Sequence, residues 1–331
     1  MPKAGIPPSA LHSAFQQSAF QQSAFGNPHS ALEFGVVSSE PLHRVAVLII
    51  TYRTYPELRR CLASLAADGA AVDVIVVDHE SDPAEVAAIR REFPWTRILV
   101  EPANAGFAAG VNRGARETAA EYLLLVNPDS FVEPGLPARL AAWMDAHPEV
   151  GIVGPSISNP DGSTQASARR FPDFTTAIAG RSAWLTRVLP GNPLTRHNLP
   201  YARTAPGEPI EVDWVSGACM MIRRGTFDQL GGIDEGFFLY WEDADFCRRA
   251  KQARWRTVYL PVPGTVHIGG ASSRHASDAA LQAFHDSAYR LFVKHTTPVG
   301  RFFAPLVRGA LRARLALMRR LVRAQVRRSH E

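Results

Sequence analysis

The chain has 331 residues, of which 46% are hydrophobic and 20% are charged, so it can bury the core of one large α/β domain or of two smaller ones. The formal net charge is +5, but nine arginines and one acid follow residue 300, and the first 300 residues hold 27 basic and 30 acidic side chains. The first 300 residues therefore lack the net positive charge that is typical of a nucleic-acid-binding protein, and no nucleic-acid partner is expected.

Cysteine content and hydropathy define the expected setting of the protein. Its three cysteines, Cys61, Cys219 and Cys247, are odd in number and scattered, which excludes a disulfide framework and a zinc cluster and favours a reducing, cytoplasmic location. No apolar run approaches the roughly 18 residues that a membrane span needs.

Residues 1–43 differ in composition from the rest of the chain. The tripeptide Ser-Ala-Phe occurs there three times, and the segment lacks the basic start and the apolar centre of a secretory signal. We therefore expect a disordered low-complexity extension, followed by a folded domain at residues 44–300.

The first element of this domain is an apolar run at residues 45–51, which is too short for a helix and is bounded by polar residues, as in a strand buried on both faces. Similar strand signals follow at residues 72–78, 98–100, 122–127, 212–222 and 257–260. Helical patterns occur at residues 56–67, 84–92 and 106–118 and from Glu242 onward. Because strands and helices alternate, we expect an α/β fold with a mostly parallel central sheet and helices on both faces.

Polar residues follow three of these strands, at the ends where such sheets bind ligands. The segments are Thr51-Tyr52-Arg53, Asp78-His79-Glu80-Ser81-Asp82 and Asn127-Pro128-Asp129-Ser130. These segments contain the first candidate functional residues.

A second group of candidates lies at residues 237–245, where three carboxylates follow an aromatic run. Burying carboxylates is unfavourable unless they have partners or a chemical task, and aromatic neighbours raise their pKa values. Glu242 and Asp243 are therefore candidates for a general base. The alternative is a solvated helix N-terminus, since acidic residues suit that end of a helix and Arg248 and Arg249 follow in the next turn.

The order of these motifs from about Val45 to Arg274 resembles that of the family 2 inverting glycosyltransferases with the GT-A fold, and most of all their bacterial rhamnosyltransferase branch. Each motif alone is weak, but the ordered set is specific. The resemblance implies a nucleotide-binding half at about residues 44–130 and an acceptor and catalytic half at about residues 131–300.

The resemblance implies that Thr51 and Tyr52 line the nucleotide site, with Arg53 beside them at a position where Asn is commoner. Asp78 matches the acid that accepts a hydrogen bond from a pyrimidine base, because uracil and thymine present an N3–H donor to a carboxylate. A turn-forming aspartate at the end of a strand is the alternative for Asp78. His79 is a second position where Asn is commoner.

The segment Asn104-Ala-Gly106-Phe-Ala-Ala-Gly-Val-Asn-Arg-Gly114 resembles the family segment before the metal site. Its small residues can either pack a helix closely on the sheet or let backbone amides approach the donor, and packing is the favoured role. The segment does not read Gly-x-Gly-x-x-Gly, so it is no dinucleotide fingerprint.

Asn127-Pro128-Asp129 matches the family's acidic metal motif, with Asn127 in place of the first acid. The resemblance implies that Asp129 is the main carboxylate ligand of Mg²⁺ or Mn²⁺, which neutralises the nucleoside diphosphate leaving group. His267, in a His-x-x-Gly-x-Ser turn, resembles the histidine that adds a nitrogen ligand. A structural hydrogen bond is the alternative for His267.

Asp243 matches the family's catalytic base, and one base in a single in-line displacement implies inversion at the anomeric carbon. Glu242 would orient the acceptor or tune Asp243, while Asp245 would pair with Arg249. Four further residues are expected to face the donor and acceptor sugars: Trp214, Ser216, Gly217 and Trp241. The alternative for Trp214 is a tryptophan of the hydrophobic core.

These assignments predict a metal-dependent inverting hexosyltransferase. The resemblance implies transfer of rhamnose from dTDP-rhamnose, or of another sugar from a dTDP- or UDP-linked donor, to a cell-surface glycan or a polyprenyl-linked acceptor. A nucleotidyltransferase is disfavoured because residues 51–56 contain no glycine-rich phosphate cradle. A non-catalytic sugar-nucleotide or membrane-binding protein with a degenerate site remains the alternative.

The tail at residues 301–331 is predicted to contain a basic amphipathic helix at 302–328. One helical stripe is expected to hold Phe303, Leu306, Val307, Ala310, Leu311, Leu317, Met318, Leu321, Val322 and Gln325, with most arginines off the stripe. Such a helix can lie on an anionic membrane, here the inner face of the cytoplasmic membrane. Packing on the body or in a homodimer interface is the alternative.

Overall fold

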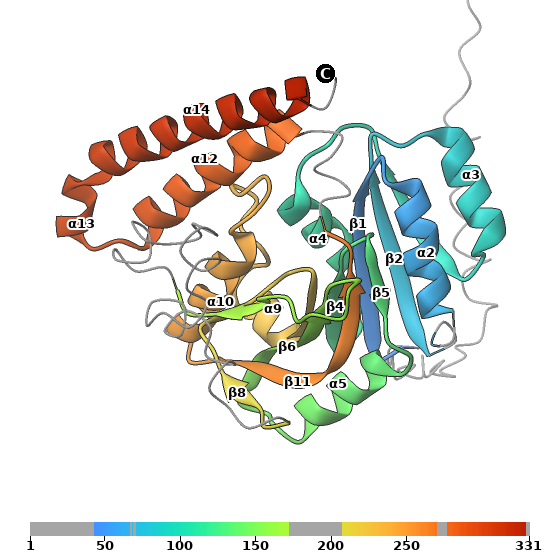
Figure 1. The fold of residues 1–331 in the computed structure, drawn as a ribbon. Helices are drawn as coiled ribbons and strands as arrows, with labels where there is room; N and C mark the ends of the chain where they lie inside the picture. Colours follow the sequence, from blue (N-terminus) through green and yellow to red (C-terminus); the bar gives the residue numbers. More distant parts are fainter. Residues whose placement is uncertain (1–42, 67, 69–70, 172–206, 270–276, 329–331) are drawn as a thin grey trace, which may run out of the picture. The chain divides into compact units, whose positions relative to one another are not determined.

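The computed structural model describes residues 43–66, 68, 71–171, 207–269 and 277–328 (Figure 1). The expected extension at residues 1–43 lies outside the described residues except for His43. The glycine and serine of the predicted histidine turn, Gly270 and Ser272, lie outside them as well.

Within the described residues a nine-stranded sheet has the strand order β3-β2-β1-β4-β10-β6-β11-β5, with β8 paired to β11. Its strands are β1 (Val45–Tyr52), β2 (Val72–His79), β3 (Thr96–Glu101), β4 (Tyr122–Val126), β5 (Ser130–Val132), β6 (Val150–Ser158), β8 (Ile210–Glu211), β10 (Cys219–Arg223) and β11 (Arg256–His267). Strands β1 to β4 are mutually parallel, and β6 and β11 share their direction because β10 is antiparallel to both β4 and β6. The predicted, mostly parallel sheet is therefore confirmed.

Helices cover both faces of the sheet, and this explains why β1 is apolar at consecutive positions. Val47 and Ile49 pack in one core with the helices α2 (Tyr55–Leu65), α3 (Pro83–Glu92) and α5 (Leu136–Asp145). Leu48 and Ile50 pack in a second core with α4 (Phe107–Ala115), α9 (Arg224–Gln229) and α10 (Glu242–Gln252). Each such buried side chain contributes about 1.5–3 kcal/mol to folding.

Glycines bring α4 unusually close to the sheet. A Cβ atom added at Gly110 would lie 2.6 Å from Cγ2 of Ile50, and one added at Gly114 would lie 3.3 Å from Cδ2 of Leu48. Larger residues would push the helix away from β1. The close packing expected of the small residues in this segment is therefore present.

The second half departs from the sequence expectation in two ways. The strand expected at residues 212–222 is broken into β9 (Trp214–Val215) and β10, because β9 pairs with β7 (Ala168–Arg169) in a separate two-stranded sheet. The helices α5 and α12 (Ser277–His295) and the strand β6 were not predicted. Because β9 and β10 belong to different sheets, Ser216, Gly217 and Ala218 form a bend between the two sheets.

The predicted tail helix is present as α14 (Ala304–Arg328), which follows a short helix α13 (Pro298–Phe302) and runs back along α12 (Figure 1). Arg319 pairs with Asp278 of α12. Leu315, which was not part of the predicted stripe, is buried, whereas Leu306 and Leu317 of the stripe are exposed. No helix among the described residues has the length and apolarity to cross a bilayer.

Candidate active site

The predicted site residues lie along one edge of the sheet, because the parallel strands end there. Thr51 at the end of β1 is paired in register with Asp78 at the end of β2. Asn127 follows β4, and His267 ends β11 next to Ser130 of β5. One edge therefore collects the predicted nucleotide and metal residues from four strands.

Asp78 combines burial with an unused acceptor atom. Its carboxyl group is 1% exposed, and its Oδ2 atom accepts a hydrogen bond from the Tyr55 hydroxyl at 3.0 Å. Its Oδ1 atom has no hydrogen-bond partner in the part of the chain that the structure describes. Burial raises the pKa of Asp78, and the Tyr55 hydrogen bond opposes that rise. A buried acceptor without a partner is a place where a ligand N–H group can bind.

Tyr55 is a functional candidate that the sequence motifs did not reveal. Its hydroxyl donates to Asp78 and accepts from the backbone N–H of Asp82 at 2.7 Å. These two hydrogen bonds fix the position of the hydroxyl group. Burial raises the pKa of Tyr55 to about 12, so the hydroxyl remains protonated as a donor. Tyr55 therefore orients the Asp78 carboxylate.

Tyr52, Arg53 and His79 form hydrogen bonds or ion pairs with other residues of the protein. Arg53 forms an ion pair of 2.8 Å with Glu80, and the Tyr52 hydroxyl donates to the same carboxylate at 3.3 Å. The two ring nitrogens of His79 each lie 3.2 Å from a backbone carbonyl, those of Ala103 and Gly106. The two positions that depart from the family pattern thus stabilise the loops around the site, and donor contacts by Tyr52 and Arg53 stay predictions.

Asp129 and His267 lie next to each other, as the sequence predicted. The Nε2 atom of His267 is 3.2 Å from Oδ1 of Asp129 and 3.2 Å from Nδ2 of Asn127. Asp129 is 3% exposed, so the pair is largely shielded from solvent.

Gln165 fixes the orientation of His267, and no sequence motif indicated it. Its Nε2 atom donates to the His267 carbonyl at 2.7 Å, so its Oε1 atom faces Nδ1 of His267 at 3.0 Å and accepts from it. This arrangement places the imidazole hydrogen on Nδ1 and leaves the Nε2 lone pair directed at Asp129 and Asn127.

The side chains of Asp129 and His267 fit a divalent cation whose remaining coordination positions are filled by substrate phosphates. No group of three or more His, Cys, Asp or Glu side chains that could hold a metal occurs within the described ranges. One carboxylate and one imidazole nevertheless suffice for Mg²⁺ or Mn²⁺ when phosphate oxygens and water fill the other positions. Asp129 and His267 are the residues of this chain that would hold the ion.

Asp243 and Glu242, at the start of α10, have different environments. The Asp243 carboxylate accepts from the backbone N–H of Gly217 at 3.1 Å and from that of Ala244 at 2.7 Å. Glu242 is 6% exposed, and its Oε2 atom has no hydrogen-bond partner among the residues described. Burial, and secondly the charge of Asp243, raises the pKa of Glu242 well above its usual range. Asp243 is thus held by backbone donors, whereas Glu242 is favoured in its neutral form.

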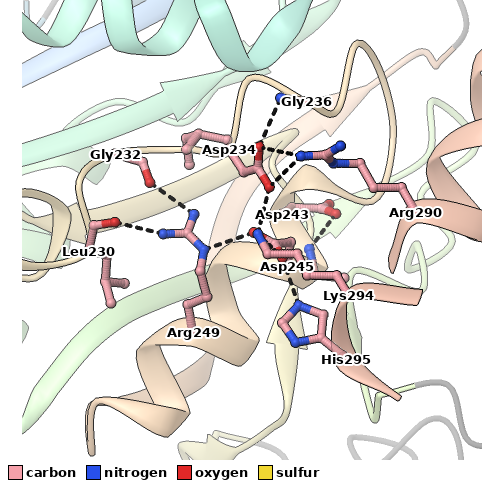
Figure 2. A network of polar contacts seen from close by, with 12 residues as sticks. Leu230, Gly232, Asp234, Gly236, Asp243, Asp245, Arg249, Arg290, Lys294 and His295 are labelled. Carbon is pink, nitrogen blue, oxygen red and sulfur yellow. Dashed lines mark hydrogen bonds and ion pairs between the residues drawn. The ribbon is translucent and has the colours of Figure 1, made fainter. Parts of the chain in front are cut away.

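Asp245 is a structural residue, and its predicted pairing with Arg249 is confirmed. Its carboxylate is fully buried, 2.8 Å from the Arg249 guanidinium, 2.8 Å from Nζ of Lys294 and 2.7 Å from Nε2 of His295 (Figure 2). Arg249 also donates to the carbonyls of Leu230 and Gly232. Several partners thus compensate the burial of this carboxylate.

The predicted sugar-facing tryptophans are in contact with each other. Trp214 is 6% exposed, its Nε1 atom donates to the Arg170 carbonyl at 3.0 Å, and its ring centroid is 6.3 Å from that of Trp241. Trp241 is only partly buried. Sugar contacts by these two rings, and by Ser216 and Gly217, stay predictions.

Gly106 brings the start of α4 against the loop before Glu242. It adopts φ +91°, and a Cβ atom there would lie 2.4 Å from the Phe238 carbonyl oxygen. Asn104 Oδ1 accepts from the Gly106 N–H at 3.0 Å, and the next N–H, of Phe107, donates to the Phe238 carbonyl at 2.8 Å. Asn104 and Gly106, predicted as donor-site residues, therefore also support the loop before Glu242.

Comparison with known proteins places this site in a family. The family model "Glycosyl transferase family 2" matches residues 46–231, which is more than half of the chain. The chain belongs to glycosyltransferase family 2. An N-acetylglucosaminyl-diphospho-decaprenol L-rhamnosyltransferase from Mycobacterium tuberculosis is 34% identical over 296 residues, which cover 86% of this chain and 94% of that protein. The chain is thus a glycosyltransferase of the bacterial rhamnosyltransferase-like branch.

Two further comparisons concern a more distant relative and the fold. A low-salt glycan biosynthesis hexosyltransferase from Haloferax volcanii is 25% identical, with 70% of this chain and 69% of that protein covered. A mannosyltransferase from Pyrobaculum calidifontis, solved with GDP-mannose and Mn²⁺, aligns with a TM-score of 0.51 at 19% identity over 82% of this chain and 69% of that one. The structural likeness confirms the expected GT-A fold.

Proposed function

We propose that this family 2 glycosyltransferase transfers rhamnose from dTDP-rhamnose, with inversion, to a hydroxyl of a lipid-linked N-acetylglucosamine acceptor. The rhamnosyltransferase that is 34% identical supports the sugar and the acceptor, and the bend at residues 216–218 is the observation that carries the reaction. Gly217 donates to Asp243, and the next carbonyl, of Ala218, accepts from the N–H of Asn127 at 3.0 Å. The bend therefore contacts both Asp243, the candidate base, and the Asn127–Asp129 segment.

The arrangement supports a single displacement. Asp243 removes the proton from the acceptor hydroxyl while the hydroxyl oxygen bonds to the anomeric carbon and the bond to the nucleoside diphosphate breaks. Asp78 accepts from N3–H of the base and so anchors the donor. A cation held by Asp129 and His267 would neutralise charge on the departing diphosphate. Attack opposite the leaving group inverts the anomeric centre.

A donor panel tests the proposal. Purified protein with Mn²⁺ and a polyprenyl-diphosphate N-acetylglucosamine acceptor is expected to release nucleotide fastest from dTDP-rhamnose. Asp78→Asn is expected to lower kcat/KM for that donor by about 10- to 100-fold, because a charge-assisted hydrogen bond is lost. Donor binding without turnover of any sugar nucleotide would instead favour the non-catalytic alternative.

The helical tail supports attachment to the inner face of the cytoplasmic membrane. The tail surface is the set of exposed apolar residues on and beside α13 and α14: Val299, Phe302, Phe303, Leu306, Leu317, Leu321 and Val322. The exposed residues Arg308, Arg312 and Arg320 belong to α14, and each basic residue near anionic headgroups contributes about 1 kcal/mol. An anionic bilayer matches both features, and a lipid-linked acceptor is found there.

Replacing Leu306, Leu317 and Leu321 together with glutamine is expected to weaken binding to phosphatidylglycerol vesicles by about 100-fold, since each loses roughly 1 kcal/mol of apolar burial. Vesicle sedimentation measures the change. Val100→Gln, at an exposed valine on β3, is the matched control. Unchanged sedimentation, together with a loss of dimer in gel filtration, would assign the tail surface to a homodimer interface.

A further inference from the structure

The turn that leads into Glu242 has a strained backbone. Tyr240 and Trp241 have φ values of +68° and +70°, in the left-handed region that large side chains rarely occupy. Such residues remain there only when their surroundings hold them. The turn immediately precedes the helix that carries Asp243, so its conformation sets where that helix begins.

Helix α12 holds this turn from one side. The Ser287 hydroxyl donates to the Leu239 carbonyl at 2.9 Å. The Phe284 ring lies 5.7 Å from that of Tyr240 and 5.4 Å from that of Trp241, measured between centroids. The Leu239 carbonyl belongs to the peptide plane whose rotation changes φ of Tyr240. Ser287 therefore fixes the plane that the strained conformation depends on.

The same helix also binds the chain on both sides of the turn (Figure 2). Arg290 and Lys294 pair with Asp234, at 3.0 and 2.6 Å, before the turn. Lys294 and His295 contact Asp245, which lies two residues beyond Asp243. Helix α12 thus spans the segment from Asp234 to Asp245 with contacts at its start, middle and end.

We propose that α12 positions the Asp243 carboxylate by holding the strained turn, so that the C-terminal helices complete the active site. The inference rests on the proposed role of Asp243 as base. Helix α12 lies beyond residues 46–231, the part matched by the family model. Ser287 and Phe284 are positioning residues, since they act on Asp243 through the turn that they contact.

The test compares Ser287→Ala, Phe284→Leu and Ser287→Thr, the last of which keeps the hydroxyl donor. The first two are expected to lower kcat about 10-fold each while the KM for donor stays within about twofold, because Asp78 and Asp129 are untouched. Ser287→Thr is expected to retain kcat within about threefold. Thr96→Val is the matched control, since its hydroxyl also donates to a backbone carbonyl, that of Phe93, at the far edge of the sheet.

Hydrogen exchange of the peptide that covers residues 237–245 gives a readout that does not need turnover. Exchange is expected to accelerate at least 10-fold in Ser287→Ala and to stay unchanged in Thr96→Val. Unchanged exchange and unchanged kcat in both Ser287→Ala and Phe284→Leu would overturn the inference. A loss of activity in Asp243→Asn beside full activity in these variants would leave the proposed function intact and reject only the role of α12.

Discussion

Asp243→Asn is expected to lower kcat by about 10²- to 10⁴-fold while donor affinity changes little, because a general base contributes a factor of that size. Asparagine has nearly the same shape and retains an oxygen that accepts from a backbone N–H, but it cannot take the acceptor proton. Gly217 and Ala244 donate to different carboxylate oxygens, so the asparagine oxygen keeps one of these two backbone hydrogen bonds. Nucleotide release under saturating donor and acceptor measures kcat, and calorimetry measures donor binding.

Glu242→Gln is the control, since glutamine resembles a neutral glutamic acid. Burial raises the pKa of Glu242, so the neutral form extends to higher pH in the folded protein than in the unfolded chain. The stabilisation from this neutral form is complete below the unfolded pKa and is lost as pH rises through the folded one. Glu242→Gln should therefore keep kcat within about 10-fold and make the free energy of unfolding less sensitive to rising pH. A larger loss of kcat in Glu242→Gln than in Asp243→Asn would make Glu242 the base.

The sequence predicted the strands of residues 45–127 well because their signals are local. The strands β1 and β4 are almost wholly apolar, β2 is apolar except for Asp73 before its end, and polar residues end or follow each strand at the same edge of the sheet. Asp78 and Asn127 could therefore be placed from the chain alone. The pairing of Asp129 with His267 followed from motif order, and the register of β5 with β11 brings the two residues together.

What the sequence missed depends on contacts between distant segments. Gln165 has no motif around it and reaches His267 only because β6 and β11 are neighbours. Tyr55 is an ordinary aromatic residue until the fold places its hydroxyl on Asp78. Hydrophobic periodicity showed that α14 is amphipathic, but it could not show that α12 covers part of it and leaves Leu306 and Leu317 exposed.

Removal of the divalent cation is expected to abolish turnover, and Mn²⁺ is expected to restore it, because the diphosphate would otherwise depart without charge compensation. Asp129→Asn should weaken Mn²⁺ binding in the presence of dTDP by at least about 10-fold, since a carboxylate ligand loses its charge. Electron paramagnetic resonance of Mn²⁺ titrated into protein with dTDP measures this affinity without an acceptor. Full turnover in EDTA would contradict the prediction.

Gln165→Leu tests whether the orientation of the His267 imidazole matters for metal binding, because it leaves both proposed metal ligands, Asp129 and His267, in the chain. Leucine has a similar size but cannot accept from Nδ1 of His267, so the imidazole can rotate or carry its hydrogen on Nε2, the atom that faces Asp129. Loss of such an outer partner typically weakens metal binding by about 10- to 100-fold. Gln252→Leu, at an exposed position at the end of α10, is the matched control and should leave Mn²⁺ affinity unchanged. If Gln165→Leu binds Mn²⁺ and dTDP like the unmodified protein while Asp129→Asn does not, then Asp129 alone holds the ion and His267 has the structural role that the sequence left open.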